Sequence, residues 1–291
     1  MTTQELAKAV SCYLQMRQLV QAKNGGPDAA VQITLDQTVS WQASQVWQKV
    51  WWLFFFSGMT TRTAAPRAAA ARAGGWFENF SVFANGNSQA THPWHVTRSR
   101  GPKGGCVFQP VGAQAKFFCA RIEPYSSMPF KTGAKVLYRV NKLADFFTAI
   151  DFAARSAGRP FVHFLAGGDA YSPNALSNAL AALSPATGPI TAVHCLSDLG
   201  FQCCKPDIWM CRIASYCGWV PSFTLEDLLG NRRTSWQALW ETCLQIANAA
   251  NITLGVPNPL REFDWYVANY CMIYRPQGCP CDQLVGRNGP F

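Results

Sequence analysis

The sequence predicts a mainly α-helical protein that carries a small β-containing insertion. Apolar residues recur at the three- and four-residue spacing of helices before residue 74 and again after residue 142. Between these parts, residues 74–132 are rich in Gly, Asn, Ser and Pro and contain only short β-prone runs. The chain has 291 residues, 49% hydrophobic and 14% charged, so it can bury a core and does not have the composition of a disordered chain.

Three helices are predicted in the N-terminal part of the chain. The first has one apolar face and ends at Asn24-Gly25-Gly26-Pro27. The second is so dense in Trp and Phe that we expect it to be buried on nearly all sides. The third is Ala-rich and follows a polar turn over residues 57–63; its arginines suit a solvated face or phosphate contacts. These helices are predicted at residues 4–22, 41–57 and 64–73, and the arginines are Arg62, Arg67 and Arg72.

The insertion is predicted to hold a small antiparallel sheet and to be strongly basic. Its β-prone runs are residues 107–108, 115–122 and 135–140. Because phosphates attract such cations, we consider the insertion a candidate contact with the DNA backbone. The pair His92 and His95 lacks the nearby carboxylates or cysteines of a metal site. The basic residues are Arg98, Arg100, Lys103, Lys116, Arg121, Lys131, Lys135 and Arg139.

Helical spacing returns in the C-terminal half, where most of the remaining elements are predicted. Thr224 precedes a short apolar run, as an N-cap residue does. Turns at Gly200–Pro206 and Gly218–Pro221 separate the elements on either side of them. The predicted helices are residues 143–156, 173–183, 189–199, 207–217, 224–229, 236–250 and 258–270.

Charge and apolar patterning indicate the compartment and the class of partner. The 25 Lys and Arg residues exceed the 16 acids and give a formal net charge of +9, which favours nucleic acid first and an anionic membrane surface second. The run from Val50 to Phe56 is far shorter than the ~20 residues of a membrane span, and the first residues do not read as a secretory signal. We therefore expect a cytoplasmic protein without a membrane partner, whose 12 cysteines are mostly buried thiols.

The segment from Leu183 to Arg212 contains a turn, a helix, a second turn and an aspartate at the start of another helix. Gly188 and Pro189 mark a helix start, where free backbone N–H groups and the helix dipole favour a phosphate. Asp207 follows Pro206 and precedes an apolar run, so an N-cap role is one interpretation of this residue.

This segment resembles the helix–hairpin–helix DNA glycosylase superfamily, whose members excise bases from DNA. The family pattern is a Leu-Pro-Gly-x-Gly hairpin, a Thr-Ala or Lys-x-Ala helix ending in Leu-Gly-Tyr/Phe, and next an Asp that is followed by His-x-x-Arg. Two departures are that the first hairpin glycine is missing and that Trp209 stands where a histidine is common. The matching residues are Leu183-Ser-Pro-Ala-Thr-Gly188, Thr191-Ala192, Leu199-Gly200-Phe201 and Asp207-Ile-Trp-Met-Cys-Arg212.

The resemblance implies a catalytic role for Asp207. Cleavage of an N-glycosidic bond develops positive charge on the deoxyribose, which a carboxylate stabilises or relieves by activating water. Relatives that also cut the strand use a lysine that corresponds to Ile190 or Thr191, so we expect a monofunctional enzyme. Lys205 is the nearby amine that could change this expectation, although it also suits a phosphate contact. The expected DNA-binding residues are Ser184, Thr187, Gly188, Ile190, Thr191, Lys205 and Arg212.

The resemblance also implies a two-lobed helical architecture and a pocket for a flipped base. One lobe would combine residues 1–75 with 231–291; residues 76–140 would be the insertion, and 141–230 the lobe with the hairpin. Thr60 and Arg62 are further candidates, and core packing is the alternative role for the aromatic residues. The expected pocket residues are Trp51, Trp52, Phe55, Met59, Trp209, Asp264 and Trp265.

The substrate and the cysteine tail leave alternatives open. The excised base would be a repair lesion or a hypermodified phage base removed in antiviral defence, and a non-catalytic DNA-binding protein is the alternative to an enzyme. Some relatives hold an iron–sulfur cluster with four cysteines after the last helix. Here only Cys271, Cys279 and Cys281 lie there, so a cluster or zinc site would need a distant thiol such as Cys243. We expect no cofactor, with the tail a remnant of such a site.

Overall fold

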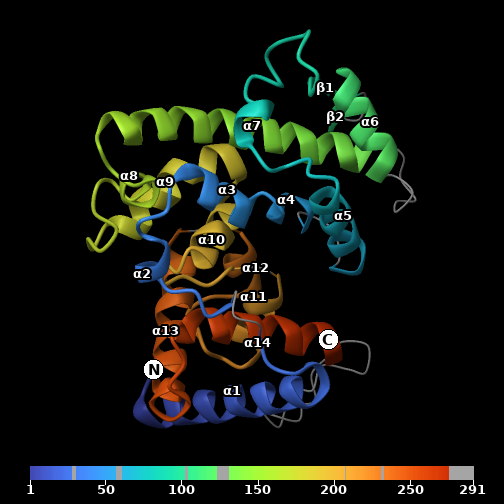
Figure 1. The fold of residues 1–291 in the computed structure, drawn as a ribbon. Coiled ribbons are helices and arrows are strands. Elements are labelled where there is room, and N and C mark those ends of the chain that lie inside the picture. The colour runs from blue at the N-terminus through green and yellow to red at the C-terminus, as the bar shows by residue number, and fades with distance from the viewer. Residues whose placement is uncertain are drawn as a thin grey trace. The chain divides into compact units, whose positions relative to one another are not determined.

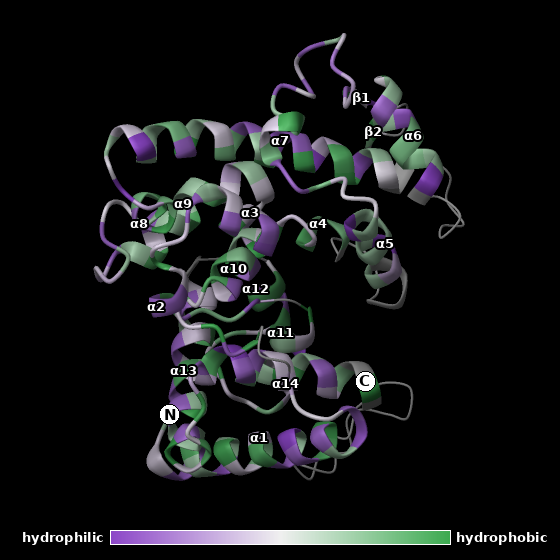
Figure 2. Cartoon of the chain, in the orientation of Figure 1, coloured by the Kyte–Doolittle hydropathy of each residue, from purple (hydrophilic) through white to green (hydrophobic). Residues whose placement is uncertain are grey.

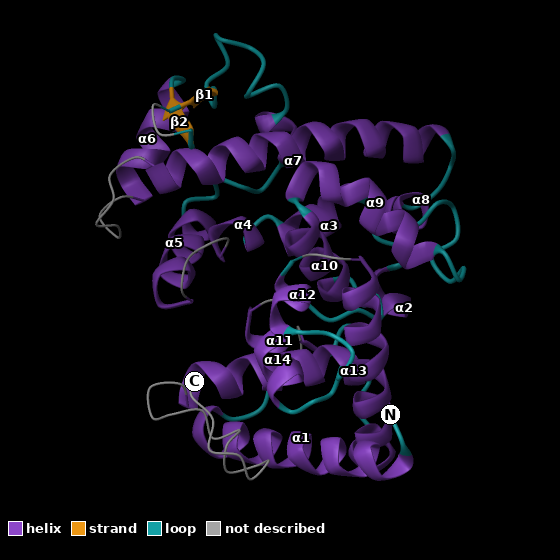
Figure 3. Ribbon diagram, turned by 180° about the vertical axis from the view of Figure 1, so that it is seen from behind, coloured by secondary structure: helices purple, strands orange, loops and turns teal. Residues whose placement is uncertain are grey.

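The computed structural model of this chain confirms a mainly α-helical protein. In the part that it describes, the strands are limited to one two-stranded antiparallel sheet, and the other regular elements are helices (Figure 3). No described helix is long and apolar enough to cross a membrane. The described residues are 1–27, 31–56, 61–101, 104–122, 131–206, 208–230 and 233–274.

The chain divides into two compact units. The terminal unit contains Met1–Thr38 and Leu196–Phe291, and the central unit contains Val39–Cys195. These boundaries differ from the predicted ones. Residues 39–75 lie in the central unit rather than with the two termini, and residues 196–230 lie with the termini rather than with the hairpin.

The terminal unit is built on the N-terminal helix α1, which packs against α13 and α14. Thr2 and Glu5 form a capping box at its start, and its end at Asn24 agrees with the predicted Gly stop. Hydrophobic and hydrophilic residues alternate along α1 in Figure 2, and its buried Tyr13 contacts Phe263 of α14 with ring centroids 4.7 Å apart. The helices of this unit are α1 (Thr3–Asn24), α2 (Leu35–Thr38), α11 (Ile208–Tyr216), α12 (Leu225–Leu229), α13 (Arg233–Leu254) and α14 (Pro259–Tyr274).

The central unit is organised around its longest helix, α7 (Lys131–Ser156). The β1–β2 sheet, α6 and the 3-10 helix η2 pack on α7, as do α8 and α9 (Figure 1). Helix α10 begins in this unit and ends in the terminal unit. The other elements are α3 (Ala43–Val50), α4 (Leu53–Phe56), α5 (Thr61–Ala73), η2 (Phe80–Phe83), β1 (Val96–Arg100), β2 (Cys106–Pro110), α6 (Ala113–Ile122), α8 (Phe161–Leu165), α9 (Ala175–Thr187) and α10 (Pro189–Asp198).

The single helix predicted over residues 41–57 is divided into α3 and α4. The indole of Trp52 donates to the carbonyl oxygen of Lys49 at 2.6 Å. In an uninterrupted helix, that carbonyl would accept the amide of residue 53. This side-chain bond lies at the point where the helix breaks.

The predicted sheet is wrong in two of its three runs. Residues 107–108 do lie in a strand, β2, which pairs with β1 in an antiparallel register that places Arg98 opposite Phe108. Residues 115–122 form α6, and residues 135–140 lie within α7. The β-prone side chains recur at helical spacing in both runs, and burial of those faces outweighs the residues' strand propensity.

Candidate nucleic-acid interface

The hairpin between α9 and α10 is tighter than predicted. Helix α9 continues through Pro185 to Thr187, so Gly188 alone separates it from Pro189 at the start of α10. Gly188 has φ +84° and ψ 153°, a conformation that side-chain-bearing residues rarely adopt. The turn between α9 and α10 therefore requires a glycine at position 188.

Most hydrogen-bond donors of the hairpin are used within it. The hydroxyl of Ser184 donates to the oxygen of Leu180 at 2.6 Å, and that of Thr187 to the oxygen of Leu183 at 3.0 Å. The amide of Gly188 donates to the oxygen of Ser184 at 2.8 Å. Contacts from Ser184, Thr187 and Gly188 to DNA would therefore need donors that already bind carbonyl oxygens of the hairpin. The first-turn amides of α10, which include those of Ile190 and Thr191, have no carbonyl of their own helix to bind.

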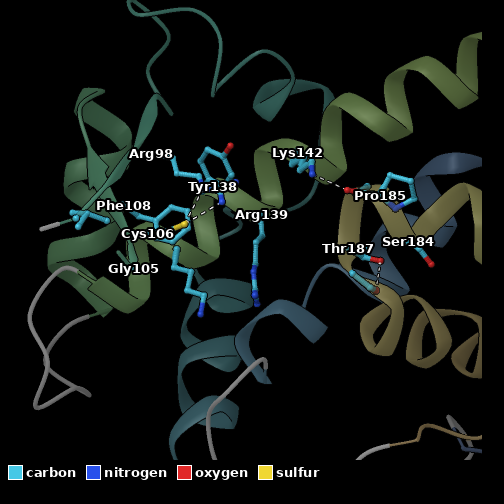
Figure 4. A pocket seen from close by; sticks show the side chains of 15 residues that line it. Arg98, Gly105, Cys106, Phe108, Tyr138, Arg139, Lys142, Ser184, Pro185 and Thr187 are labelled. Atoms are coloured by element: carbon cyan, nitrogen blue, oxygen red, sulfur yellow. Dashed lines mark hydrogen bonds between the residues drawn. The ribbon is translucent and has the colours of Figure 1, made fainter. Parts of the chain in front are cut away.

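Beside this hairpin lies a pocket of about 860 Å³ within the central unit. The β1–β2 hairpin, α7 and the end of α9 form its walls. Figure 4 shows Arg139 extending from α7 between Cys106 of β2 and Thr187 of α9. None of the described residues that line the pocket is Asp or Glu, whereas four are cations: Arg98, Lys135, Arg139 and Lys142.

Three of the cations share one face of α7 because they follow helical spacing. Lys135, Arg139 and Lys142 are separated by four and three residues, and Tyr138 lies on the same face. Like charges four residues apart destabilise a helix by about 0.2–0.5 kcal/mol, so the charges on this face do not stabilise α7. The ammonium of Lys142 also donates to the carbonyl of Pro185 at 2.7 Å, which ties α7 to α9.

Local contacts orient or dehydrate two of the charges. Arg98 donates from Nε and Nη2 to the sulfur of Cys106 at 3.2 and 3.0 Å, and these hydrogen bonds raise the pKa of Arg98. Burial lowers the pKa of the half-buried Arg139, although a guanidinium stays protonated in proteins. A phosphate that reaches Arg139 would therefore meet a cation that has already lost part of its water.

Two aromatic rings complete the wall formed by β2 and α7. Phe108 and Tyr138 are half-buried, line the pocket, and have ring centroids 5.1 Å apart at an interplanar angle of 57°. The pocket thus combines positive charge with exposed aromatic surface.

Two of the aromatic residues predicted to hold a flipped base, Trp51 and Phe55, belong to the core of the central unit. Trp51 and Phe55 are 1% and 0% exposed, and both contact the buried ring of Phe77. Trp52 is half-buried beside His194. These contacts correct the prediction that Trp51 and Phe55 form pocket walls. Met59 and Thr60 lie outside the described residues.

Arg67 also departs from the prediction, since its side chain is 1% exposed rather than on a solvated face. Arg72 is exposed, and its guanidinium lies 5.8 Å from the ring centroid of Trp51. The side chain of Arg62 is not among those described.

In the terminal unit, Asp264 belongs to a buried ion cluster. Arg261 donates to Asp264 at 2.9 Å and to Asp198 at 2.7 Å, with all three side chains at most 11% exposed. Trp265 is half-buried and meets Tyr266 edge-on. The prediction that Asp264 contacts a base is thus opposed by its pairing with Arg261.

The predicted catalytic residue, Asp207, lies outside the described residues. Among the neighbouring residues, Lys205 is half-buried, and the guanidinium of Arg212 lies 5.7 Å from the ring centroid of Trp209. Residues 199–206, which precede Asp207, are held at both ends. Thr38 donates to the oxygen of Leu199 at 2.6 Å, and the indole of Trp240 donates to that of Cys204 at 2.7 Å.

The described cysteines are free thiols, and most are buried, in agreement with the prediction. Cys271 is buried at the end of α14, and Cys279 and Cys281 lie outside the described residues. Within the described ranges, no three His, Cys, Asp or Glu residues are placed to hold a metal. His95 bonds Gly86 instead, with 3.0 Å between its Nδ1 and that carbonyl oxygen.

The sequence contained a signal for two pocket residues that we did not single out, Tyr138 and Lys142. Together with Lys135 and Arg139 they repeat at intervals of three and four, as one helix face does. We predicted a strand at residues 135–140. Successive side chains of a strand point to opposite sides, so that prediction did not place Tyr138 and Arg139 on a shared face.

No family model, curated protein or solved structure matches the chain.

Proposed function

We propose that this protein binds DNA at the pocket and hairpin of the central unit and is a monofunctional DNA glycosylase. The observation that carries the proposal is the pocket beside Gly188, with four cations on its walls and no acid among its described lining residues. Phosphate contacts supply most of the affinity of proteins for DNA, and Lys and Arg supply most of those contacts. The formal net charge of +9 supports the same partner.

The glycosylase chemistry is proposed for Asp207, on the resemblance of residues 183–212 to that superfamily. Its carboxylate would stabilise the positive charge that develops on the deoxyribose, or activate the attacking water. The anchoring of Leu199 and Cys204 supports this role, because a catalytic group needs a chain segment that is held in place.

The absence of lyase activity is proposed from the residues at the lysine slot. Ile190 and Thr191 carry no amine, so neither can form a Schiff base with the sugar. Lys205 is the amine near Asp207 in the chain, and we assign it to phosphate. Borohydride would therefore trap no covalent complex between the enzyme and abasic DNA.

Asp207→Asn is the variant that tests this chemistry. Full-length protein is incubated with duplexes that carry alkylated, deaminated or oxidised bases, and with hypermodified phage DNA, and alkali-labile sites are then counted. We expect one substrate class to be cut and the variant to lose that activity while it still binds DNA. Asp36→Asn is the matched control, since it removes the same charge from an exposed aspartate of the same unit.

A non-catalytic DNA-binding protein is the second candidate. It is favoured by the missing first glycine of the hairpin, at a position where α9 continues through Pro185. Tight DNA binding with no abasic product from any of these substrates would support it over the enzyme.

A further inference from the structure

The shape of the pocket in the central unit says more about the ligand than its charge does. Its volume of about 860 Å³ lies within the range of sites that enclose small molecules, about 300–1,000 Å³. In a paired duplex the bases are stacked inside, and the phosphates are presented from the outside of the helix. An unpaired strand can instead turn its bases and its backbone into a concave site.

The lining of the pocket suits both parts of such a strand. Sites for single strands combine a positively charged groove with aromatic side chains on which bases stack. Phe108 and Tyr138 provide adjoining aromatic surface, and cations lie on the same two elements, β1–β2 and α7. A site for phosphate alone would not require the two rings.

We propose that this pocket binds an unpaired nucleic-acid strand, with a base on Phe108 and Tyr138 and its phosphates on the four cations. The inference rests on the proposed function only in taking DNA as the partner. It adds that the protein holds DNA with at least one nucleotide out of its duplex at this pocket, which the central unit forms by itself.

The cations are prepared for phosphate in different ways. Cys106 and Tyr138 orient the guanidinium of Arg98 through side-chain hydrogen bonds, and since a guanidinium has five N–H groups, others can face a ligand. Lys142 uses one donor on Pro185, and an ammonium has three. Lys135 is exposed at the pocket wall, and the half-buried Arg139 lies between the β1–β2 side and α9 (Figure 4). A nucleic-acid strand that crosses the pocket would therefore contact Arg98 of β1 and the three cations of α7.

The first experiment measures affinity against salt concentration. Full-length protein is titrated into a fluorescent 12-nucleotide oligothymidine and into a fully paired duplex of the same length. We expect tighter binding of the oligothymidine. For single strands, each lost phosphate contact reduces the slope of log affinity against log salt by about 0.7, so Lys135→Gln and Lys142→Gln should each do so. Lys8→Gln, at an exposed residue of α1 in the terminal unit and outside the pocket, is the matched control and should leave the slope unchanged.

The second experiment tests the stacked base. Stacking of one base on an aromatic side chain changes affinity by roughly 5- to 150-fold, so Phe108→Leu should weaken oligothymidine binding within that range. The salt slope of this variant should stay at the wild-type value, because no phosphate contact is lost. An unchanged thermal melting curve shows that the variant is folded.

The exposed thiol of Cys106 reports directly on occupancy of the pocket. Its alkylation by maleimide is followed by peptide mass spectrometry, and oligothymidine should slow it at least tenfold. Thymidine triphosphate and inorganic phosphate, at the same phosphate concentration, should not. If the triphosphate protects as well as the oligonucleotide, the pocket is a free-nucleotide site and the strand proposal is overturned.

Equal affinity for the duplex, or variants of Lys135, Lys142 and Phe108 that bind like the wild type, would also overturn the inference. The proposed glycosylase fails separately, when no abasic product forms on any substrate. A protein that binds oligothymidine at this pocket without making such product would lose the proposed activity and keep the inference.

Discussion

Arg261→Met is expected to destabilise the terminal unit strongly. The guanidinium of Arg261 is 11% exposed and pairs with two carboxylates, Asp198 and Asp264, which are 3% and 7% exposed. The variant fills most of the same volume but leaves both carboxylates without this partner. Asp198 is also the last residue of α10, where the helix dipole disfavours an anion. Loss of the arginine should therefore destabilise the carboxylate of Asp198 more than that of Asp264.

The size of the effect follows from the burial. Removing one partner of a buried ion pair costs about 3–5 kcal/mol. With a urea dependence of about 2 kcal/mol per molar, the unfolding midpoint should fall by about 2 M. Circular dichroism during urea unfolding measures this shift. Hydrogen exchange should rise in peptides of α14 and the end of α10, while peptides of α7 in the central unit serve as the internal control.

A second variant separates charge from packing. Combining Asp198→Asn, Arg261→Met and Asp264→Asn leaves no charge in the cluster, so part of the lost stability should return. If the single variant loses less than about 1 kcal/mol, the carboxylates are solvated and the reasoning is wrong. If the triple variant is no more stable than the single one, the lost packing of the arginine stem explains the effect instead.

Two further predictions concern a buried thiol and two glycines. Burial raises the pKa of Cys203, so the folded protein keeps this proton above about pH 8.5, where an unfolded chain releases it. The stability from this thiol is thus complete below that pH and falls above it by about 1.4 kcal/mol per pH unit. In Cys203→Ala the free energy of unfolding, measured with urea, should therefore fall less steeply between pH 8.5 and 10 than in the wild type. Gly188→Ala should cost about 1–3 kcal/mol from backbone conformation alone, since its φ is +84° and a Cβ there would meet no atom within 4 Å. Gly200→Ala should cost clearly more by the same measurement, because its added Cβ would lie 2.2 Å from the backbone nitrogen of Leu35.

Each of these predictions has its own refutation. A slope between pH 8.5 and 10 that is unaffected by Cys203→Ala would show that this thiol reaches solvent. Equal losses for the two glycine variants would show that the backbone of Thr34 and Leu35 yields to the added methyl group at Gly200.

Helices with a clean apolar face were predictable from the sequence, as α1 and the capped α12 show. Thr224 and Asp227 form the capping box of α12, and the pattern Thr-Leu-Glu-Asp already contains it. Where residue propensity and periodicity disagreed, periodicity was correct. Ala115, Phe118 and Cys119 recur at three and four residues and are all buried in α6, despite the β-prone composition of that run.

Tertiary contacts account for most of what could not be predicted. One unpredicted feature is local: the Trp52 indole binds the Lys49 carbonyl, three residues away, where the helix is interrupted, and the dense Trp and Phe content of this run did not indicate the break. The hairpin could be predicted because the turn itself requires Gly188. The opposite wall of the pocket is formed by residues of β1 and β2, which lie far from the hairpin in the sequence. The buried pair of Arg261 with Asp198 joins α14 to the end of α10, 63 residues apart in the chain, which sequence spacing does not reveal.

The crowded cations of α7 give ionic strength two opposite effects on the same side chains. Without a ligand, Lys135 and Arg139 repel one another four residues apart, and added salt screens that repulsion, so α7 should hold together better in moderate salt. With nucleic acid bound, the same salt competes for the phosphates and weakens the complex. Added salt should therefore raise the stability of the free protein and lower its affinity for nucleic acid. The buffer that best preserves the protein in storage is then one in which it binds nucleic acid least.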